Sequence, residues 1–127
     1  MILERVKVEN PQLAQSGSIM YSISAYDKNG FFSEIKKRYH DFFVLHELFL
    51  NRYRGLYLPQ LPPKKTFNNK DRAFIEERRC QLQEFLINIC RHDYLYQSEE
   101  FHAFARSTPE KDLVPGLKEK IKFDIGK

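Results

Sequence analysis

The sequence predicts an α+β domain: a three-stranded antiparallel β-meander packed against a layer of three to four helices. Two observations support this fold class. Apolar and polar residues alternate before Tyr39, as in half-buried strands, and apolar residues recur at helical spacing after it. The 127 residues, 42% of them hydrophobic, suffice for one domain with its own core. We expect the folded domain to span residues 1–107 and a tail or linker to span residues 108–127.

The three strands are expected over residues 2–9, 18–26 and 31–37. The middle strand has the clearest two-residue alternation, because one of its faces is apolar throughout. That face consists of Ile19, Tyr21, Ile23 and Ala25. Turn-forming residues at 10–17 predict a loop, and Asn29-Gly30 favours a tight hairpin before the third strand.

The helices are expected over residues 41–52, 71–91 and 97–106. Each has apolar residues three or four positions apart, which places them on one side of a helix. Asn69 or Asp71 is a suitable N-cap for the longest helix, and Ser98 for the last. From Ser107 onward the chain is polar with two prolines, which indicates the tail or linker.

Composition and charge restrict the classes of function. Residues 31–80 hold 11 Lys or Arg against 6 Asp or Glu, so the positive excess lies mid-chain. This excess favours an anionic membrane, nucleic acid or acidic protein as partner, or it is simply a solvated basic surface. No apolar run approaches the ~20 residues of a membrane span. The charged start is not a signal peptide. If Cys80 and Cys90 lie on one helix, they are ~15 Å apart and cannot form a disulfide, which indicates a reducing cytosolic setting.

Sequence features of enzymes, metal sites and nucleic-acid readers are not found. The chain has no Gly-rich phosphate loop and no recognisable nucleophile motif. Metal-ligand spacing is not seen among its histidines, which are His40, His46, His92 and His102. No reading helix or stacking motif indicates nucleic-acid binding. We therefore expect no catalysis, no cofactor, no metal and no nucleic-acid partner.

Two basic positions point to an anion. Arg78 lies in the middle of the apolar stripe of the 71–91 helix, with Arg79 on its flank. A charge there needs either an internal carboxylate or a pocket that holds an external anion. Arg38 and Tyr39 lie where the third strand becomes a helix, and helix-start amides with an arginine suit phosphate. The alternative for this second position is a basic strand end with Tyr39 in the core.

The segment LPQLPPKK, residues 58–65, has two interpretations. Pro59, Pro62 and Lys64 match a PxxPxK ligand of an SH3 domain. The same segment also suits a stiff loop that holds Lys64 over an anion, with Leu58 and Leu61 packed inward. In that case the prolines reduce the chain entropy lost in fixing Lys64.

These segments, in this order, resemble the Phox homology (PX) domain of sorting nexins over about residues 2–107. The similarity rests on Arg38-Tyr39-His40-Asp41-Phe42, on residues 58–64, and on Phe74 to Arg79 with the Leu82 and Phe85-Leu86 that follow. The family's second-helix arginine precedes that leucine by four residues, which selects Arg78 over Arg79. The resemblance implies a domain that binds phosphoinositides, most often phosphatidylinositol 3-phosphate, on cytosolic membrane faces.

The resemblance also implies a role for each matching position. Arg38 would hold the 3-phosphate, and Tyr39 would stack on the inositol ring. Lys64 would reach the 1-phosphate, and Arg78 would bind the 4- and 5-hydroxyls. These roles agree with the chemistry of the side chains, because a guanidinium fork binds phosphate oxygens or diols and a lysine binds a single phosphodiester as a point charge.

Further contacts with the headgroup or membrane are expected around this set. They involve His40, Lys65, Phe67, Lys70 and Arg72, with Leu56 and Tyr57 as additional apolar contacts. His40 departs from the family's usual Ser, Thr or Arg, and its protonation would strengthen binding at mildly acidic pH. Phe67 is the only large apolar residue in the segment that inserts into the bilayer in this family, so insertion should be modest.

The function expected from these features is membrane targeting. The partner would be a phosphoinositide-containing membrane, on the cytosolic face of endosomes, together with proteins of a trafficking complex. The alternative is a protein-interaction PX module with weak lipid binding that uses Pro59–Lys64 or its surface.

Overall fold

The computed structural model describes residues 3–27, 32–64 and 70–106. The predicted Asn29-Gly30 turn, Lys65 and Phe67 lie outside these residues, as does the expected tail at 108–127. The domain boundary after residue 107 therefore stays a prediction.

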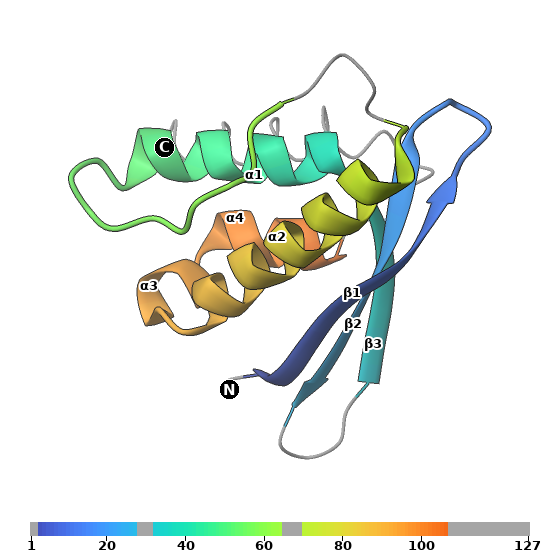
Figure 1. Cartoon of the computed structure of the whole chain (residues 1–127). Helices are drawn as coiled ribbons and strands as arrows, with labels where there is room; N and C mark the ends of the chain where they lie inside the picture. The colour runs from blue at the N-terminus through green and yellow to red at the C-terminus, as the bar shows by residue number, and fades with distance from the viewer. Residues whose placement is uncertain (1–2, 28–31, 65–69, 107–127) are drawn as a thin grey trace.

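Three antiparallel strands form one sheet in the order β1-β2-β3, which confirms the predicted meander (Figure 1). The strands are β1 (Leu3–Leu13), β2 (Ile19–Asp27) and β3 (Phe32–Arg38). Val8 pairs with Ile23, and Ile23 pairs with Ile35, so one apolar row crosses all three strands. This row faces the helices and forms part of the core.

Strand β1 continues to Leu13, so the loop predicted over residues 10–17 was wrong in its first half. The register shifts between Glu9 and Gln12, and Asn10 has a φ of 56°. This irregularity absorbs Asn10 and Pro11 without ending the strand. Proline is tolerated because β1 is an edge strand, where not every backbone N–H is needed for pairing.

Four helices follow the sheet in the described part of the chain. They are α1 (Tyr39–Arg52), α2 (Arg72–Cys90), α3 (Asp93–Tyr96) and α4 (Glu99–Arg106). The three predicted helices are confirmed within two residues at each end, and α3 is an additional single turn. Asp71 caps α2 by accepting from the Phe74 amide at 3.1 Å, and the Ser98 hydroxyl accepts from the Phe101 amide at 3.0 Å. No helix in the described part of the chain is long and apolar enough to cross a bilayer.

The helices cover one face of the sheet and bury a continuous core between the two layers (Figure 1). Its largest fully buried apolar side chains are Tyr21, Phe42, Leu45, Phe49, Leu82, Phe85, Leu86, Ile89, Leu95 and Phe104. Cys90 is also buried, and burial raises the pKa of its thiol to about 11. Cys80 is exposed, and both cysteines are free.

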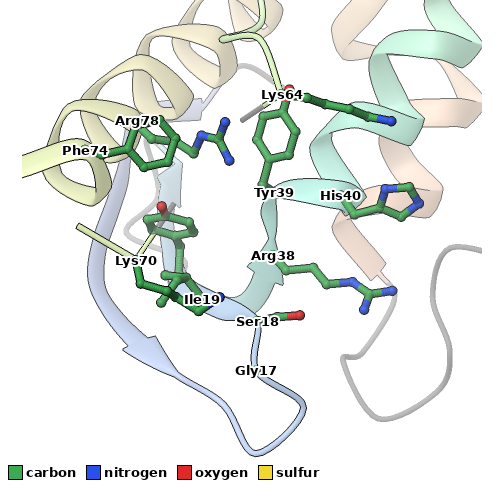
Figure 2. A pocket seen from close by; sticks show the side chains of 11 residues that line it. Gly17, Ser18, Ile19, Arg38, Tyr39, His40, Lys64, Lys70, Phe74 and Arg78 are labelled. Atoms are coloured by element: carbon green, nitrogen blue, oxygen red, sulfur yellow. The ribbon is translucent and has the colours of Figure 1, made fainter. Parts of the chain in front are cut away.

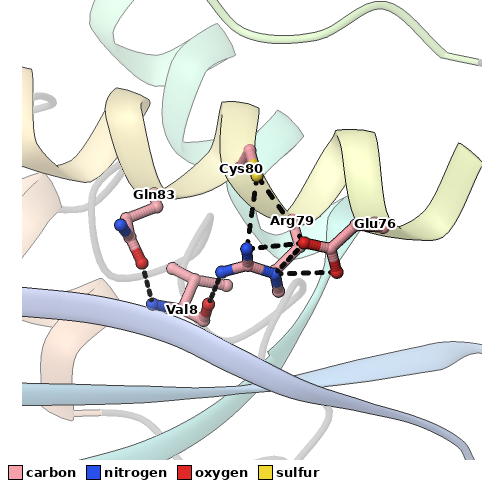
Figure 3. A network of polar contacts seen from close by, with 5 residues as sticks. All are labelled: Val8, Glu76, Arg79, Cys80 and Gln83. Atoms are coloured by element: carbon pink, nitrogen blue, oxygen red, sulfur yellow. Dashed lines mark hydrogen bonds and ion pairs between the residues drawn. The ribbon is translucent and has the colours of Figure 1, made fainter. Parts of the chain in front are cut away.

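Side chains of α2 bind the backbone of the edge strand β1 at Val8 (Figure 3). The amide oxygen of Gln83 accepts from the Val8 N–H at 2.9 Å, and Nη1 of Arg79 donates to the Val8 carbonyl at 2.7 Å. Glu76 holds the guanidinium of Arg79 at 2.7 Å. Arg79, which the helical spacing placed on the flank of the apolar stripe, therefore attaches α2 to the sheet.

Paired polar groups hold the C-terminal end of α1 in place. Nη1 of Arg52 donates to both carboxylate oxygens of Glu100 at 2.8 Å, and Glu100 is fully buried. The hydroxyl of Tyr53 donates to the carbonyl of Tyr94 at 3.1 Å. We call this region, defined by Arg52, Tyr53, Tyr94 and Glu100, the distal cluster.

Candidate functional site

A pocket of about 270 Å³ opens where the β1–β2 hairpin, the start of α1, the proline-rich segment and the start of α2 meet (Figure 2). Its described lining residues are Gly17, Ser18, Ile19, Tyr21, Arg38, Tyr39, His40, Lys64, Lys70, Phe74 and Arg78. The four positions carried over from the resemblance, Arg38, Tyr39, Lys64 and Arg78, are all among them. Segments separated by up to sixty residues in sequence thus meet at one opening.

Arg38 occupies the junction between β3 and α1. It is the N-cap of α1, with an extended backbone. Its backbone N–H donates to Oδ2 of Asp41 at 3.0 Å, and its Nε lies 3.8 Å from Oδ1 of the same carboxylate. The guanidinium extends toward the open side of the pocket beside Ser18 (Figure 2).

Arg78 and Tyr39 form a stacked pair at the inner wall of the pocket. The guanidinium carbon of Arg78 lies 3.8 Å from the centroid of the Tyr39 ring and 4.5 Å from that of Phe74. The Tyr39 hydroxyl donates to the carbonyl of Pro62, and Nη2 of Arg78 donates to the carbonyl of Pro63 at 2.7 Å. Both site residues therefore also hold the proline-rich segment in place.

Arg78 is buried without a carboxylate partner among the described residues. It is 7% exposed, and its buried Nε has no hydrogen-bond partner there. Burial lowers the pKa of Arg78, while the neighbouring tyrosines act in the opposite direction. Of the two explanations for a charge on the apolar stripe, the internal carboxylate pair is therefore not found within residues 3–27, 32–64 and 70–106. The geometry is that of a cation directed into a pocket, stabilised by aromatic faces.

The proline-rich segment forms the wall that carries Lys64. Pro59 and Pro62 are buried, and Leu58 and Leu61 pack against the core as expected. An SH3 domain would need those prolines exposed, so the structure disfavours the PxxPxK interpretation. Lys64 is exposed, and its Nζ lies 4.1 Å from the centroid of the Phe43 ring.

The expected additional contacts divide into two groups. His40 and Lys70 line the pocket, whereas Arg72 begins α2 and is not in the lining. Leu56 and Tyr57 are exposed, but they follow the far end of α1, about 20 Å along the helix from Tyr39. They are therefore not part of the pocket, and the expectation that they assist at the membrane stays a prediction.

Sequence reasoning missed the contribution of the β1–β2 hairpin to the pocket. Gly17 and Ser18 line its edge, and Leu13, at the end of β1, is 65% exposed. Gly17 has a φ of 93°, a conformation that favours glycine. The turn-forming residues at 10–17 predicted a loop, but only the tertiary structure brings its end against Lys70 and Arg38.

The electrostatic character of the pocket follows from its described lining. Four permanently cationic side chains contribute to it, and no Asp or Glu is among the lining residues. Arginine forks bind phosphate oxygens or vicinal hydroxyls in pairs, and a lysine binds a single phosphate as a point charge. The pocket is therefore suited to an anionic ligand such as one that carries phosphate groups.

Comparisons with known proteins agree with this geometry. The PX domain family model matches residues 27–108. The sorting nexin lst-4 of Caenorhabditis elegans is 32% identical over 115 residues, which covers 91% of this chain and 20% of the relative. Mouse sorting nexin-8 is 42% identical over 62 residues, which covers 49% of this chain and 13% of the relative. This chain thus spans a fifth or less of these two proteins.

Solved structures show the same fold. An X-ray structure of a designed CISK-PX domain superposes with a TM-score of 0.73 and 28% identity, covering 81% of this chain and 99% of that one. A chain of the SNX-BAR Mvp1 tetramer has the same TM-score at 24% identity, covering 98% of this chain and 34% of that one. The three-stranded sheet, the helical layer and the family match together show that this chain belongs to the PX domain family.

Proposed function

We propose that this PX domain is a membrane-targeting module that binds phosphoinositides and prefers phosphatidylinositol 3-phosphate on the cytosolic face of endosomes. The observation that carries the proposal is the pocket itself. It combines four cationic side chains, no acidic lining residue among those described, and a buried Arg78 without a carboxylate partner. The similarity to sorting nexins supports a role in membrane trafficking, in which the domain acts by binding rather than by catalysis.

Each matched residue has a proposed contact with the headgroup. Arg38 binds the 3-phosphate through its two Nη groups, which make no hydrogen bond with a described residue. Lys64 moves from the Phe43 ring to the 1-phosphate, a short movement for a flexible, exposed side chain. His40 and Lys70 add contacts at the edge of the pocket.

Tyr39 and Arg78 change their contact when the ligand binds. In the structure Arg78 covers one face of the Tyr39 ring. We propose that the guanidinium turns toward the 4- and 5-hydroxyls, so that the inositol ring lies against Tyr39. A phosphate at position 4 or 5 would then occupy the space of this contact, which supports a preference for the 3-phosphate alone.

A liposome-binding assay across all phosphoinositides tests the proposal. At about 0.15 M salt, where attraction between exposed charges is screened, liposomes with phosphatidylinositol 3-phosphate should bind more strongly than plain anionic ones. Arg38→Ala should reduce this binding at least a hundredfold, because two charge-assisted hydrogen bonds are lost. Its thermal unfolding midpoint should stay near that of the unmodified domain, since Arg38 is partly exposed.

Arg54→Ala is a matched control, because it removes an exposed arginine beyond the far end of α1. It should leave the lipid preference unchanged. Equal binding to all anionic liposomes by the unmodified domain would refute the lipid proposal. The domain would then have to act through proteins that bind another part of its surface, since Pro59 and Pro62 are buried.

A further inference from the structure

The junction between β3 and α1 contains a buried carboxylate that lies next to the pocket but does not line it. Asp41 is 4% exposed, and it is the third residue of α1. Oδ2 accepts from the backbone N–H of Arg38 at 3.0 Å, and Oδ1 lies 3.8 Å from the side-chain Nε of Arg38. One carboxylate therefore contacts both the backbone and the side chain of the same arginine.

The two contacts restrict how Arg38 can project. The bond to the backbone N–H is the reciprocal half of a capping box, which fixes where α1 begins. The contact with Nε restrains the guanidinium from the side that faces the protein. Neither Nη group makes a hydrogen bond with a described residue, so both remain available to a ligand, and the guanidinium lies beside Ser18 (Figure 2).

A buried cation, Lys37, interacts electrostatically with this carboxylate. Lys37 is 1% exposed, and its Nζ lies 4.7 Å from the centroid of the Phe104 ring. Burial lowers the pKa of Lys37 to about 8 while Asp41 acts to raise it, so most of the lysine stays protonated at pH 7.

We propose that Asp41 is a positioning residue that preorganises Arg38 for phosphate. The inference rests on the proposed headgroup function, which it deepens. A preorganised side chain loses less conformational freedom on binding, and one ordered long side chain corresponds to about a three- to tenfold gain in affinity.

The variant Asp41→Asn distinguishes the proposed positioning role from a mere effect of the negative charge of Asp41 on anion binding. Asparagine keeps an acceptor for the Arg38 backbone N–H but loses the charged contact with Nε. Calorimetric titration with soluble inositol 1,3-bisphosphate should give about three- to tenfold weaker binding for Asp41→Asn. Simple charge removal predicts the opposite, because deleting a carboxylate near a cationic pocket strengthens anion binding. Glu47→Gln, which removes an exposed carboxylate from α1, is the charge-matched control and should not weaken binding.

Two further measurements show whether Asp41 acts through Arg38. In an Arg38→Lys background, which lacks the Nε contact, Asp41→Asn should cause no additional weakening. In ligand-free protein, the NMR signal of the Arg38 Nε–H should exchange faster with water in Asp41→Asn than in the unmodified domain. Equal or tighter headgroup binding by Asp41→Asn, or equal weakening in both backgrounds, would overturn the proposal.

The NMR measurement distinguishes failure of this inference from failure of the proposed function. If the unmodified domain does not bind inositol 1,3-bisphosphate, the headgroup function fails. Asp41 can still be assessed, because the exchange rate of the Arg38 Nε–H is measured without ligand. An unchanged exchange rate in Asp41→Asn would overturn the positioning role independently.

Discussion

The pocket and the distal cluster both contain a buried charged side chain, but only the one in the distal cluster has an ionic partner among the described residues. At the distal cluster, Glu100 is fully buried and forms a two-bond ion pair with Arg52. At the pocket, Arg78 is buried to a similar degree but contacts only aromatic faces and one carbonyl among the described residues. Burying a charge without an ionic partner costs stability. The distal cluster thus holds the helices together, and the contrast supports the proposal that the pocket keeps its positive charge for a ligand.

The largest effect is expected at the pocket. Arg78→Met should weaken binding of inositol 1,3-bisphosphate at least about thirtyfold, because the charged donors to the headgroup are lost. The free energy of unfolding should stay the same or rise by about 1 kcal/mol, since an unpaired buried cation is replaced by an apolar chain. Calorimetric titration and urea unfolding measure the two effects.

The neighbouring arginine is the control for this variant. Arg79→Met removes the bonds to the Val8 carbonyl and to Glu76. It should lower the free energy of unfolding and leave headgroup affinity unchanged. If Arg78→Met were instead strongly destabilising, the contrast between the two regions would be wrong.

The opposite pattern is expected at the distal cluster. Glu100→Gln should lower the free energy of unfolding by about 2 kcal/mol, because a buried, doubly bonded ion pair is replaced by a weaker neutral contact. Headgroup affinity of the folded protein should not change. Urea unfolding and calorimetric titration test this pair of outcomes, and a loss of affinity at a temperature where the variant is folded would contradict it.

A smaller effect is expected from the pH dependence of Lys37. Its pKa is lowered to about 8 in the folded domain, compared with the usual 10.5. Above pH 8 the unfolded chain therefore binds more protons at this lysine, and folding becomes more favourable as pH rises. The contribution should be about 1 kcal/mol between pH 7 and pH 9.

The measurement compares unfolding free energies of the unmodified domain and Lys37→Met over this range. The difference between the two proteins isolates Lys37 from other groups. The Cys90 thiol acts in the opposite direction above pH 9, because its raised pKa keeps it protonated in the folded state. A constant difference between the two proteins would show that Lys37 keeps its ordinary pKa.

The sequence predicted the parts of the molecule that depend on local pattern. Alternation identified the strands, and helical spacing alone placed Arg78 on the buried face of α2. The tertiary contacts were not predictable in this way. Nothing in the spacing indicates that Arg78 stacks on Tyr39 or that the two residues hold adjacent proline carbonyls.

The errors have a common physical origin. β1 continues past Pro11 because an edge strand tolerates a residue without an N–H, and whether a strand lies at an edge is a property of the whole sheet. The distance of Leu56 and Tyr57 from the pocket was not evident in the sequence, because it depends on the direction in which α1 runs. Asp41 was seen only as part of a motif, since its contacts with Arg38 depend on the turn between β3 and α1.

The attachment of α2 to the edge strand β1 affects how copies of this domain can interact when they are crowded together. An uncovered edge strand offers its amides and carbonyls to any neighbouring chain and so promotes fibre-like assembly. At Val8 both groups are already occupied by Gln83 and Arg79 (Figure 3). If many copies gather on the membrane that the domain is proposed to bind, this edge gives them no free hydrogen-bonding groups at Val8. Dense recruitment can then proceed without strand-to-strand polymerisation at that position.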